Sequence, residues 1–301
     1  MKKVGIVVVT YNRQELLKEV IEALRQQSYQ DFQIVVVNNG STDETPSWLK
    51  QQEDIVTITQ ENLGGAGGFF TGMKYVAEQG YEYCWIMDDD VICRPDALEE
   101  LYKAYHIEPN IGFVCSQVIG LDGQPMNVPE LGCFLQQEGK YPPILSHVLG
   151  AEMVSIKIAT FVSIFLSTET IFKVGLPYKE YFIWGDDREY TMRIAYKYYC
   201  FVACKSVVLH KRRIQGSLTF KTESDPTRIM NYFYMYRNHA HTFMVDSRNG
   251  SMKKILYRLK MIREIINLFR NGYRIQAKIL FKAFWALHTF KPQIQFPIRK
   301  I

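Results

Sequence analysis

The run VGIVVVT (residues 4–10), the segment RQELLKEVIEALRQQ (13–27) and the run QIVVVN (33–38) decide the fold class of this 301-residue chain. The two outer runs are continuously apolar and rich in Val and Ile, which is typical of parallel strands buried on both faces. The middle segment carries apolar residues at helical spacing, among them Val20 and Leu24. Together the three segments predict a strand–helix–strand unit.

Polar side chains stand where the first two predicted helices begin. Asn12 precedes the helix and Glu15 follows three residues later, which is a capping-box arrangement. Ser41 or Asp43 can cap a second helix that begins near Pro46.

Strand and helix alternate up to about residue 116, which indicates a doubly wound, mostly parallel α/β sheet with flanking helices. Beyond that point the pattern is mixed, and the last part of the chain is helical. We predict a sheet domain over residues 1–220, with halves 1–116 and 117–220, and a helical region over 221–301. Further strands are predicted at 55–60, 83–87 and 160–167, and further helices at 68–80, 95–105, 188–197, 226–245 and from 251 onward.

The positive charge is concentrated at the C-terminal end. The net charge is +5, yet from Ser251 onward twelve Lys and Arg stand against one acid, Glu264. Apolar residues recur there in steps of three and four, so we predict basic amphipathic helices, with residues 251–285 lying on an anionic membrane surface. Docking of the stripe on the rest of the chain and a dimer contact remain alternatives, and nucleic acid is disfavoured because no binding motif accompanies the charge. The stripe consists of Ile255, Leu259, Ile262, Ile266, Phe269 and Tyr273.

The chain carries no sign of export or of a membrane-spanning helix. Its first residues read as a strand rather than as a secretory signal, and no run of 18 uncharged apolar residues occurs. The six cysteines show neither a CxxC pair nor zinc-ligand spacing, which indicates reduced thiols in a cytosolic protein.

Three consecutive carboxylates, Asp88, Asp89 and Asp90, directly follow the predicted strand at 83–87. In open α/β sheets, ligands bind at the carboxyl ends of the strands. Like charges in a row repel unless water or a cation screens them, and oxygen ligands suit Mg²⁺ or Mn²⁺. An exposed acidic turn before a helix is the alternative, but the position after a buried strand favours a metal site that binds a diphosphate.

Two other segments carry residues of functional type. The glycine-rich residues 62–68 lack the GxGxxG spacing and a Walker lysine, so a dinucleotide or P-loop site is disfavoured; we interpret them as a loop that lets backbone approach a ligand closely. Asp186 and Asp187 open a predicted helix after Trp184, where they serve either as a general base or as helix caps. A lone histidine after a strand, His210, is by itself more often structural.

Five segments in order resemble inverting family 2 glycosyltransferases with the GT-A fold, and most of all bacterial galactofuranosyltransferases, with rhamnosyltransferases next. The resemblance covers roughly residues 3–215. The ordered set is highly specific, although no single segment is. The segments are VVVTYNR (7–13), VVVNNGSTD (35–43), ENLGGAGGF (61–69), MDDDV (87–91) and WGDDREY (184–190).

The resemblance implies a role for each matching residue. It makes residues 1–116 the nucleotide-binding half and 117–220 the acceptor and catalytic half. Asp187 would be the catalytic base, while Asp88, Asp90 and His210 would hold Mn²⁺ or Mg²⁺. Asn39 would face the nucleobase of the donor. Many relatives carry Asp at this position, which leaves both uracil and thymine open as the nucleobase. The expected nucleotide-sugar contacts are Thr10, Tyr11, Arg13, Asn39, Asn62, Gly65, Asp88, Asp89, Trp184 and Asp186.

The implied activity is transfer of a sugar, galactofuranose from UDP-galactofuranose as the first expectation, to a glycan or lipid-linked acceptor in bacterial surface polysaccharide synthesis. A rhamnosyltransferase that uses dTDP-rhamnose and a non-catalytic nucleotide-sugar binder are the alternatives. A dinucleotide-dependent oxidoreductase is disfavoured by the glycine spacing. We expect a cytoplasmic protein, peripheral on the inner face of the cell membrane, and leave a homo-oligomer open.

Overall fold

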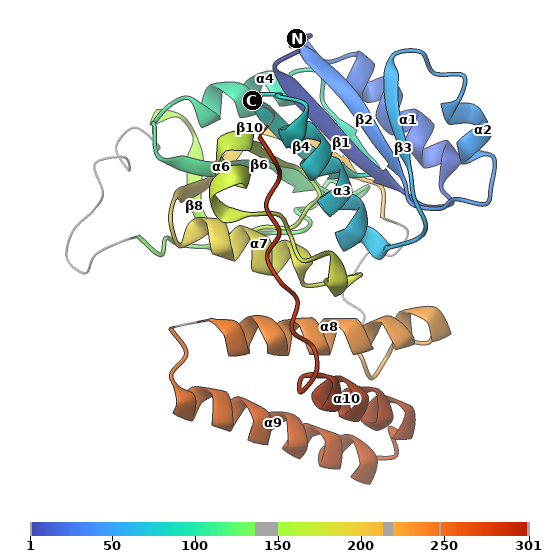
Figure 1. The fold of residues 1–301 in the computed structure, drawn as a ribbon, viewed down its shortest axis with the longest axis vertical. Coiled ribbons are helices and arrows are strands. Elements are labelled where there is room, and N and C mark those ends of the chain that lie inside the picture. Colours follow the sequence, from blue (N-terminus) through green and yellow to red (C-terminus); the bar gives the residue numbers. More distant parts are fainter. Residues whose placement is uncertain (1, 136–149, 213–218, 247, 300–301) are drawn as a thin grey trace. The chain divides into compact units, whose positions relative to one another are not determined.

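The computed structural model describes residues 2–135, 150–212, 219–246 and 248–299 (Figure 1). Contacts divide the chain into two compact units. The first comprises the described residues of Met1–Lys179, Asp187–Gln215 and Ile294–Ile301, and the second those of Glu180–Asp186 and Gly216–Gln293. Residues 180–186 thus group with the C-terminal helices, and the last residues return to the sheet unit.

The first unit is built on one mixed, mostly parallel sheet in the order β3-β2-β1-β4-β9-β6-β10-β8-β7, with β5 paired to β10. The strands β1, β2, β3 and β4 are parallel neighbours, and β9 is antiparallel between β4 and β6. The strands are β1 (Val4–Thr10), β2 (Phe32–Asn38), β3 (Ile55–Thr59), β4 (Tyr83–Asp88), β5 (Val91–Cys93), β6 (Ile111–Ile119), β7 (Glu130–Leu131), β8 (Met153–Ile158), β9 (Ile164–Ser167) and β10 (Tyr199–His210).

Helices cover both faces of this sheet, as the alternation of β1 shows. Successive side chains of a strand point to opposite faces of its sheet. Val4 and Val8 accordingly join a core cluster with α1 and α4, whereas Val7 and Val9 join a second cluster with α3. The doubly wound arrangement predicted from the sequence is therefore confirmed. The described helices and the 3-10 turn up to residue 195 are α1 (Gln14–Arg25), α2 (Thr45–Leu49), α3 (Gly64–Glu78), α4 (Ala97–Tyr105), α6 (Thr168–Val174), η1 (Lys179–Tyr181) and α7 (Asp186–Ala195).

In its described residues, the second unit is built mainly from α8 (Pro226–Val245), α9 (Ser251–Arg270) and α10 (Arg274–Ala286). Their shared core includes Tyr232 and Ala240 of α8, Leu268 of α9 and Leu280 of α10. The helices predicted over residues 226–245 and beyond 251 are thus present. Among the described helices, none combines the length and the apolar character that crossing a bilayer demands.

The glycine-rich loop predicted at residues 62–68 is wrong from Gly64 onward, because helix α3 begins there. A Cβ at Gly68 would lie 2.3 Å from Cγ1 of Val9, and one at Gly72 would lie 2.2 Å from Cγ1 of Val7. The glycines therefore allow α3 to pack directly on β1, a reason that only the packed structure reveals.

The predicted capping box is also wrong. Asn12 has a φ of 53° and Arg13 occupies the N-cap position of α1 without a side-chain cap. The Oδ1 atom of Asn12 instead accepts a hydrogen bond from the backbone N–H of Thr42 over 2.7 Å. The side chain thus ties together the two loops that follow β1 and β2. The second predicted cap is only partly present: α2 starts after Glu44, and Asp43 accepts from the N–H of Thr45 over 3.0 Å.

Candidate active site

A short strand pairing brings His210 to the acidic triplet. Strand β4 ends at Asp88, and β5 then pairs antiparallel with the end of β10, so that Val91 lies opposite His210. The backbone N–H of Lys211 donates to the carbonyl oxygen of Asp90 over 2.8 Å. The backbone therefore determines which side chains meet, although the two segments lie far apart in the chain.

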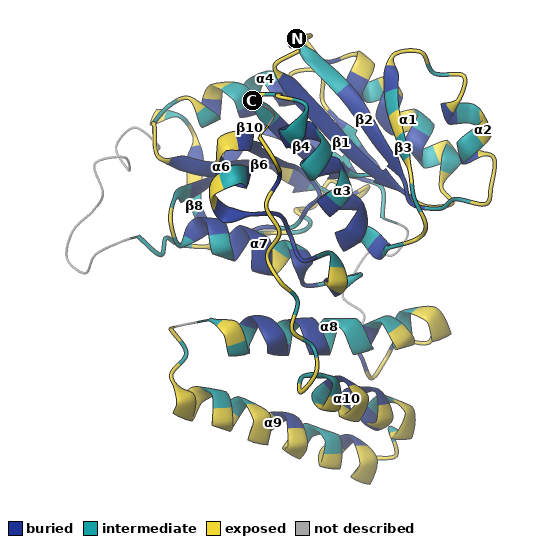
Figure 2. Cartoon of the chain, in the orientation of Figure 1, coloured by how far each residue is buried: buried dark blue, intermediate teal, exposed yellow. Residues whose placement is uncertain are grey.

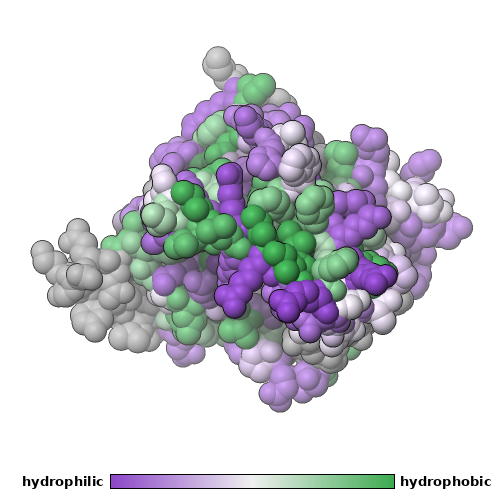
Figure 3. Space-filling view, turned by 90° about the horizontal axis from the view of Figure 1, so that it is seen from below, coloured by the Kyte–Doolittle hydropathy of each residue, from purple (hydrophilic) through white to green (hydrophobic). Residues whose placement is uncertain are grey.

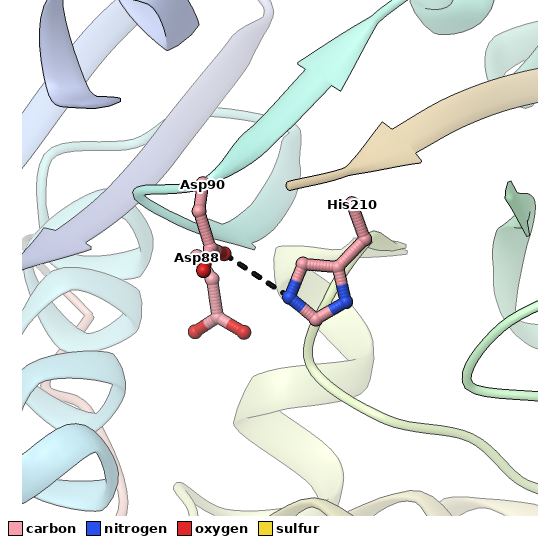
Figure 4. Close-up of side chains that lie close together, drawn as sticks. All are labelled: Asp88, Asp90 and His210. Carbon is pink, nitrogen blue, oxygen red and sulfur yellow. Dashed lines mark ion pairs between the residues drawn. The ribbon is translucent and has the colours of Figure 1, made fainter. Parts of the chain in front are cut away.

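Asp88, Asp90 and His210 form a group whose ligand atoms all lie within 4.8 Å of one another (Figure 4). The Nε2 atom of His210 is 3.1 Å from Oδ1 of Asp90. Asp90 and His210 are buried, while Asp88 is half-buried. The three residues for which the resemblance implied metal ligation are thus brought together by the fold.

Arg13 contacts the triplet from the side of β1. Its guanidinium lies 2.9 Å from Oδ2 of Asp90 and 3.1 Å from Oδ1 of Asp89. Burial opposes the charged form of Asp90, but His210 in its protonated form and Arg13 together outweigh it, and the pKa of this carboxyl group then lies below its ordinary value. Asp90 is therefore ready to act as an anionic ligand.

Asp89 has a different surrounding from its neighbours. Thr10 donates its hydroxyl to Oδ2 of Asp89 over 2.7 Å, and the side chain is 4% exposed. Burial raises the pKa of Asp89 to about 6, against the opposing influence of Arg13 and Thr10. In this structure, Thr10 and Arg13, both expected at the nucleotide, bind Asp89, which therefore positions them at the edge of the sheet.

Asn127 fixes the orientation of His210. Its Oδ1 atom lies 2.8 Å from Nδ1 of His210 and can only accept, so Nδ1 carries the proton. In the neutral ring, Nε2 then presents its lone pair toward Asp90, whose buried Oδ1 has no hydrogen-bond partner within the described residues. Two lone-pair atoms face each other at ion-pair distance, an arrangement that a cation between them would satisfy.

The donor set of this group matches a hard or borderline divalent cation. Two carboxylates and one imidazole suit Mn²⁺ and Mg²⁺ when water or substrate phosphate completes the coordination. The residues therefore fit the metal that the resemblance implies.

Asn39 holds the start of helix α3. Its amide Nδ2 donates to the carbonyl of Gly64 over 2.9 Å and lies 3.3 Å from Oδ1 of Asn62. Its Oδ1 accepts from Nε2 of Gln60 over 2.8 Å and from the N–H of Leu63 over 3.2 Å. The side chain is thereby saturated, and an Asp at this position would lose both donated bonds. That Asn39 contacts the base stays a prediction.

The other expected nucleotide contacts lie at the same edge of the sheet or beside it. Tyr11 is 45% exposed, directly after β1. Asn62 is exposed, and a Cβ added at Gly65 would meet nothing within 4 Å. These positions are accessible to a ligand, and their roles stay predictions.

Asn238 of α8 holds the turn that contains Trp184. Its Nδ2 atom lies 2.8 Å from the carbonyl oxygen of Tyr181, 3.2 Å from that of Ile183 and 2.7 Å from that of Trp184. Trp184 has a φ of 60°, and its ring lies edge-on to Tyr232 with centroids 5.3 Å apart. Hydrogen bonds therefore hold the backbone that precedes Asp186 and Asp187. Stacking of a sugar on Trp184 stays a prediction.

Asp186 and Asp187 are the first two residues of α7, so the helix begins two residues earlier than the sequence pattern predicts. Asp186 is buried and Asp187 is half-buried. The Oδ1 atom of Asp187 accepts from the N–H of Arg188 over 2.6 Å. This location is compatible with both roles weighed for these residues, and the role of Asp187 as base stays a prediction.

Sequence reasoning missed Asn127 and Asn238. Neither belongs to a motif, and both act through a single amide on a segment far away in the chain. The one sequence signal at Asn127 is its type, because Asn tolerates the left-handed backbone found there, with a φ of 49°.

Residues 5–144 match the protein family described as "Glycosyl transferase family 2". The chain is 27% identical over 263 residues to galactofuranosyltransferase GlfT1 of Mycobacterium tuberculosis, a match that covers 80% of this chain and 82% of the relative. It is also 33% identical over 104 residues to glycosyltransferase GlyG of Streptococcus pneumoniae serotype 4, covering 33% of this chain and 34% of that protein.

Two solved structures share the fold. Staphylococcus aureus TarS superposes with a TM-score of 0.56 at 14% identity over 85% of this chain, which spans 41% of the TarS chain. GalNAc-T7, solved with UDP, GalNAc and Mn²⁺, superposes with a TM-score of 0.58 at 13% identity over 81% of this chain, which spans 48% of that chain. This chain thus spans less than half of either solved structure.

The ordered motifs, the sheet topology and these relatives agree with one another. The chain carries a glycosyl transferase family 2 domain over residues 5–144, and it is a glycosyltransferase with the GT-A fold.

Proposed function

We propose that this enzyme transfers galactofuranose from UDP-galactofuranose to a glycan or lipid-linked acceptor of a bacterial surface polysaccharide, with inversion at the anomeric carbon. The observation that carries the proposal is the group of half-buried Asp88 and buried Asp90 and His210 at the carboxyl edge of the sheet. The choice of sugar is supported by the relatives named galactofuranosyltransferase GlfT1, which match most of this chain.

The proposed metal ligands are Asp88, Asp90 and His210, with Mn²⁺ or Mg²⁺ as the ion. When bound, the ion supplies positive charge that stabilises the departing diphosphate. Arg13 lies beside the same carboxylates and adds a second positive charge at this edge. Asn127 accepts from Nδ1 of His210, which leaves Nε2 as the nitrogen that would face the metal.

The proposed reaction is a single displacement. Asp187 takes the proton from the acceptor hydroxyl while the oxygen of this hydroxyl attacks the anomeric carbon of the donor sugar. At the same time, the bond between the anomeric carbon and the diphosphate oxygen breaks. Inversion follows because attack and departure occur on opposite faces of the sugar. Thr10, Tyr11, Asn39 and Asn62 are the proposed contacts of the nucleotide, together with Gly65, Asp89, Trp184 and Asp186.

Rhamnosyl transfer from dTDP-rhamnose is the alternative activity, since uracil and thymine differ by one methyl group. A donor panel separates the two: UDP-galactofuranose, UDP-galactose, UDP-glucose and dTDP-rhamnose, each with Mn²⁺ or Mg²⁺ and an extracted glycolipid acceptor. We expect transfer from UDP-galactofuranose alone. Transfer from dTDP-rhamnose alone would replace the proposed donor, and the absence of both transfer and donor hydrolysis would favour a non-catalytic binder.

The metal site is tested by calorimetric titration of UDP with Mn²⁺ present. Asp90→Ala should abolish the metal-dependent part of UDP binding. The matched control is Glu53→Gln, which removes an exposed acid on the surface of the same unit. Unchanged titration of the Asp90 variant would refute the ligand assignment.

A peripheral position on the cytoplasmic face of the membrane fits a lipid-linked acceptor. This location is part of the proposal.

A further inference from the structure

Helix α9 has two apolar faces, of which one is used inside its own unit. Met261 and Leu268 are 7% and 1% exposed, and they pack in the cluster formed with α8 and α10. A helix needs one such face to join a bundle. The second face therefore requires its own explanation.

The second face is a row of apolar residues spaced alternately four and three positions apart along α9, and these residues are exposed (Figure 2). Exposure ranges from 39% at Ile262 to 63% at Phe269. Isolated exposed apolar residues are normal, but a continuous row along about four helical turns marks an interaction surface. The row comprises Ile255, Leu259, Ile262, Ile266 and Phe269.

Helix α10 adds large apolar side chains of its own. Ile275, Phe281 and Trp285 are 63%, 53% and 66% exposed, and the rings of Phe281 and Trp285 stack with centroids 6.4 Å apart. Figure 3, viewed from below Figure 1, shows apolar side chains gathered in a band with hydrophilic ones on both sides. We define the exposed apolar residues of α9 and α10 and the basic residues between them as the α9–α10 surface.

The charge of this surface selects its partner. Residues 251–286 contain nine Lys and Arg against the single acid Glu264, which itself lies 3.9 Å from Lys221. On α9 the apolar row is flanked by Arg258 on one side and Arg263 on the other, and on α10 Lys278 and Lys282 alternate with the aromatic residues. Basic side chains beside an apolar row, with Trp among them, suit the boundary between headgroups and acyl chains.

We propose that the α9–α10 surface docks on an anionic lipid bilayer, with α9 lying in the plane of the interface and its apolar row entering the acyl boundary. A second copy of this chain is a poorer occupant, because a two-fold contact would place the same cations against each other. The inference rests on exposure and charge in the helical unit and does not depend on the proposed donor or acceptor.

Flotation of the full-length protein with vesicles tests the proposal. Binding is expected to vesicles of phosphatidylcholine mixed with phosphatidylglycerol, to weaken with added salt, and to be much lower on phosphatidylcholine alone. The variant Arg263→Gln/Lys278→Gln should lose roughly 20- to 30-fold in partitioning, since each cation near an anionic surface contributes about fivefold. The variant Ile262→Gln/Phe269→Gln should lose more than about tenfold at every salt concentration.

Leu121→Gln is the matched control, because Leu121 is 57% exposed but lies in the sheet unit. It should bind vesicles like the unaltered protein, and all variants should hydrolyse the sugar donor at the unaltered rate, which separates failure of this proposal from failure of the proposed function. Equal vesicle binding by all variants, or none by the unaltered protein, would overturn the proposal. So would a lipid-free dimer in sedimentation that the Ile262/Phe269 variant abolishes, since the surface would then belong to a second copy.

Discussion

The hydrogen bond between Asn127 and His210 leads to a prediction about metal affinity. Asn127→Gly removes the acceptor at Nδ1, which lies 2.8 Å away, while glycine retains the backbone conformation with a φ of 49°. The ring of His210 can then turn, or place its proton on Nε2, where it would block a cation. The backbone of His210 stays held opposite Val91 in the β10 ladder, so the ligand is loosened but not lost.

The magnitude follows from that partial loss. Removing the outer hydrogen-bond partner of a metal-ligating histidine weakens metal binding by about 10- to 100-fold, which equals about 1.4–2.8 kcal/mol. Because the strand still holds the residue and Asp88 and Asp90 are untouched, we expect the lower end, about tenfold in Kd for Mn²⁺. Asn127→Asp keeps an acceptor and tolerates the same backbone, so it should restore binding.

The assay is titration of Mn²⁺ followed by the electron paramagnetic resonance signal of the free ion, with UDP present throughout. Thermal unfolding of each variant controls for a general loss of structure. Binding of Mn²⁺ by Asn127→Gly within twofold of the unaltered protein would refute the reasoning, as would equal weakening by Gly and Asp.

Three further outcomes are expected. Gly68→Ala should destabilise the protein by about 1–3 kcal/mol in a urea titration, because the new Cβ would lie 2.3 Å from Val9. At Gly65 a new Cβ meets nothing within 4 Å, so Gly65→Ala should stabilise α3 by up to about 1 kcal/mol. If Gly65→Ala were the more destabilising of the two, α3 would not pack on β1 as described. Asp187→Asn should lower kcat by roughly 10²–10⁴ with unaltered thermal unfolding, and near-normal turnover would remove it as the base. Burial lowers the pKa of His241 to about 4, whereas the ordinary value in the unfolded chain is about 6.5, so the unfolded chain binds the proton first as the pH falls. The contribution of His241 to stability should therefore be complete above about pH 6.5 and be lost as the pH drops toward 4. His241→Gln should flatten that part of the pH–stability curve, and an identical slope in the variant would exclude His241 as the cause.

Local pattern determined much of the sheet unit. The runs at residues 4–10 and 33–38 are strands with the predicted C-terminal ends, because a strand buried on both faces needs continuous apolar residues and its neighbours are set by the chain's own alternation. The position of Asp88 at the end of β4 followed from the same logic. The glycosyl transferase family 2 domain was legible in short ordered segments, and the match over residues 5–144, which contains four of the five, confirms it.

Features that depend on long-range packing were not legible. The glycine-rich segment became helix because α3 needs bare backbone against β1, which a helix propensity scale penalises. Asn12 was expected to cap its own helix but binds the N–H of Thr42 in the next loop. In both cases a distant partner outweighed the local preference.

The candidate site divides in the same way. The sequence by itself determined the chemistry available, since three carboxylates after a buried strand are ligands wherever they point. Only the tertiary structure decided that His210 reaches Asp90, through the antiparallel pairing of β5 with β10, and that Asn127 sets the free nitrogen of its ring. A linear pattern carries period and residue type, whereas the meeting of two side chains depends on strand register between distant segments, which the whole packed chain determines.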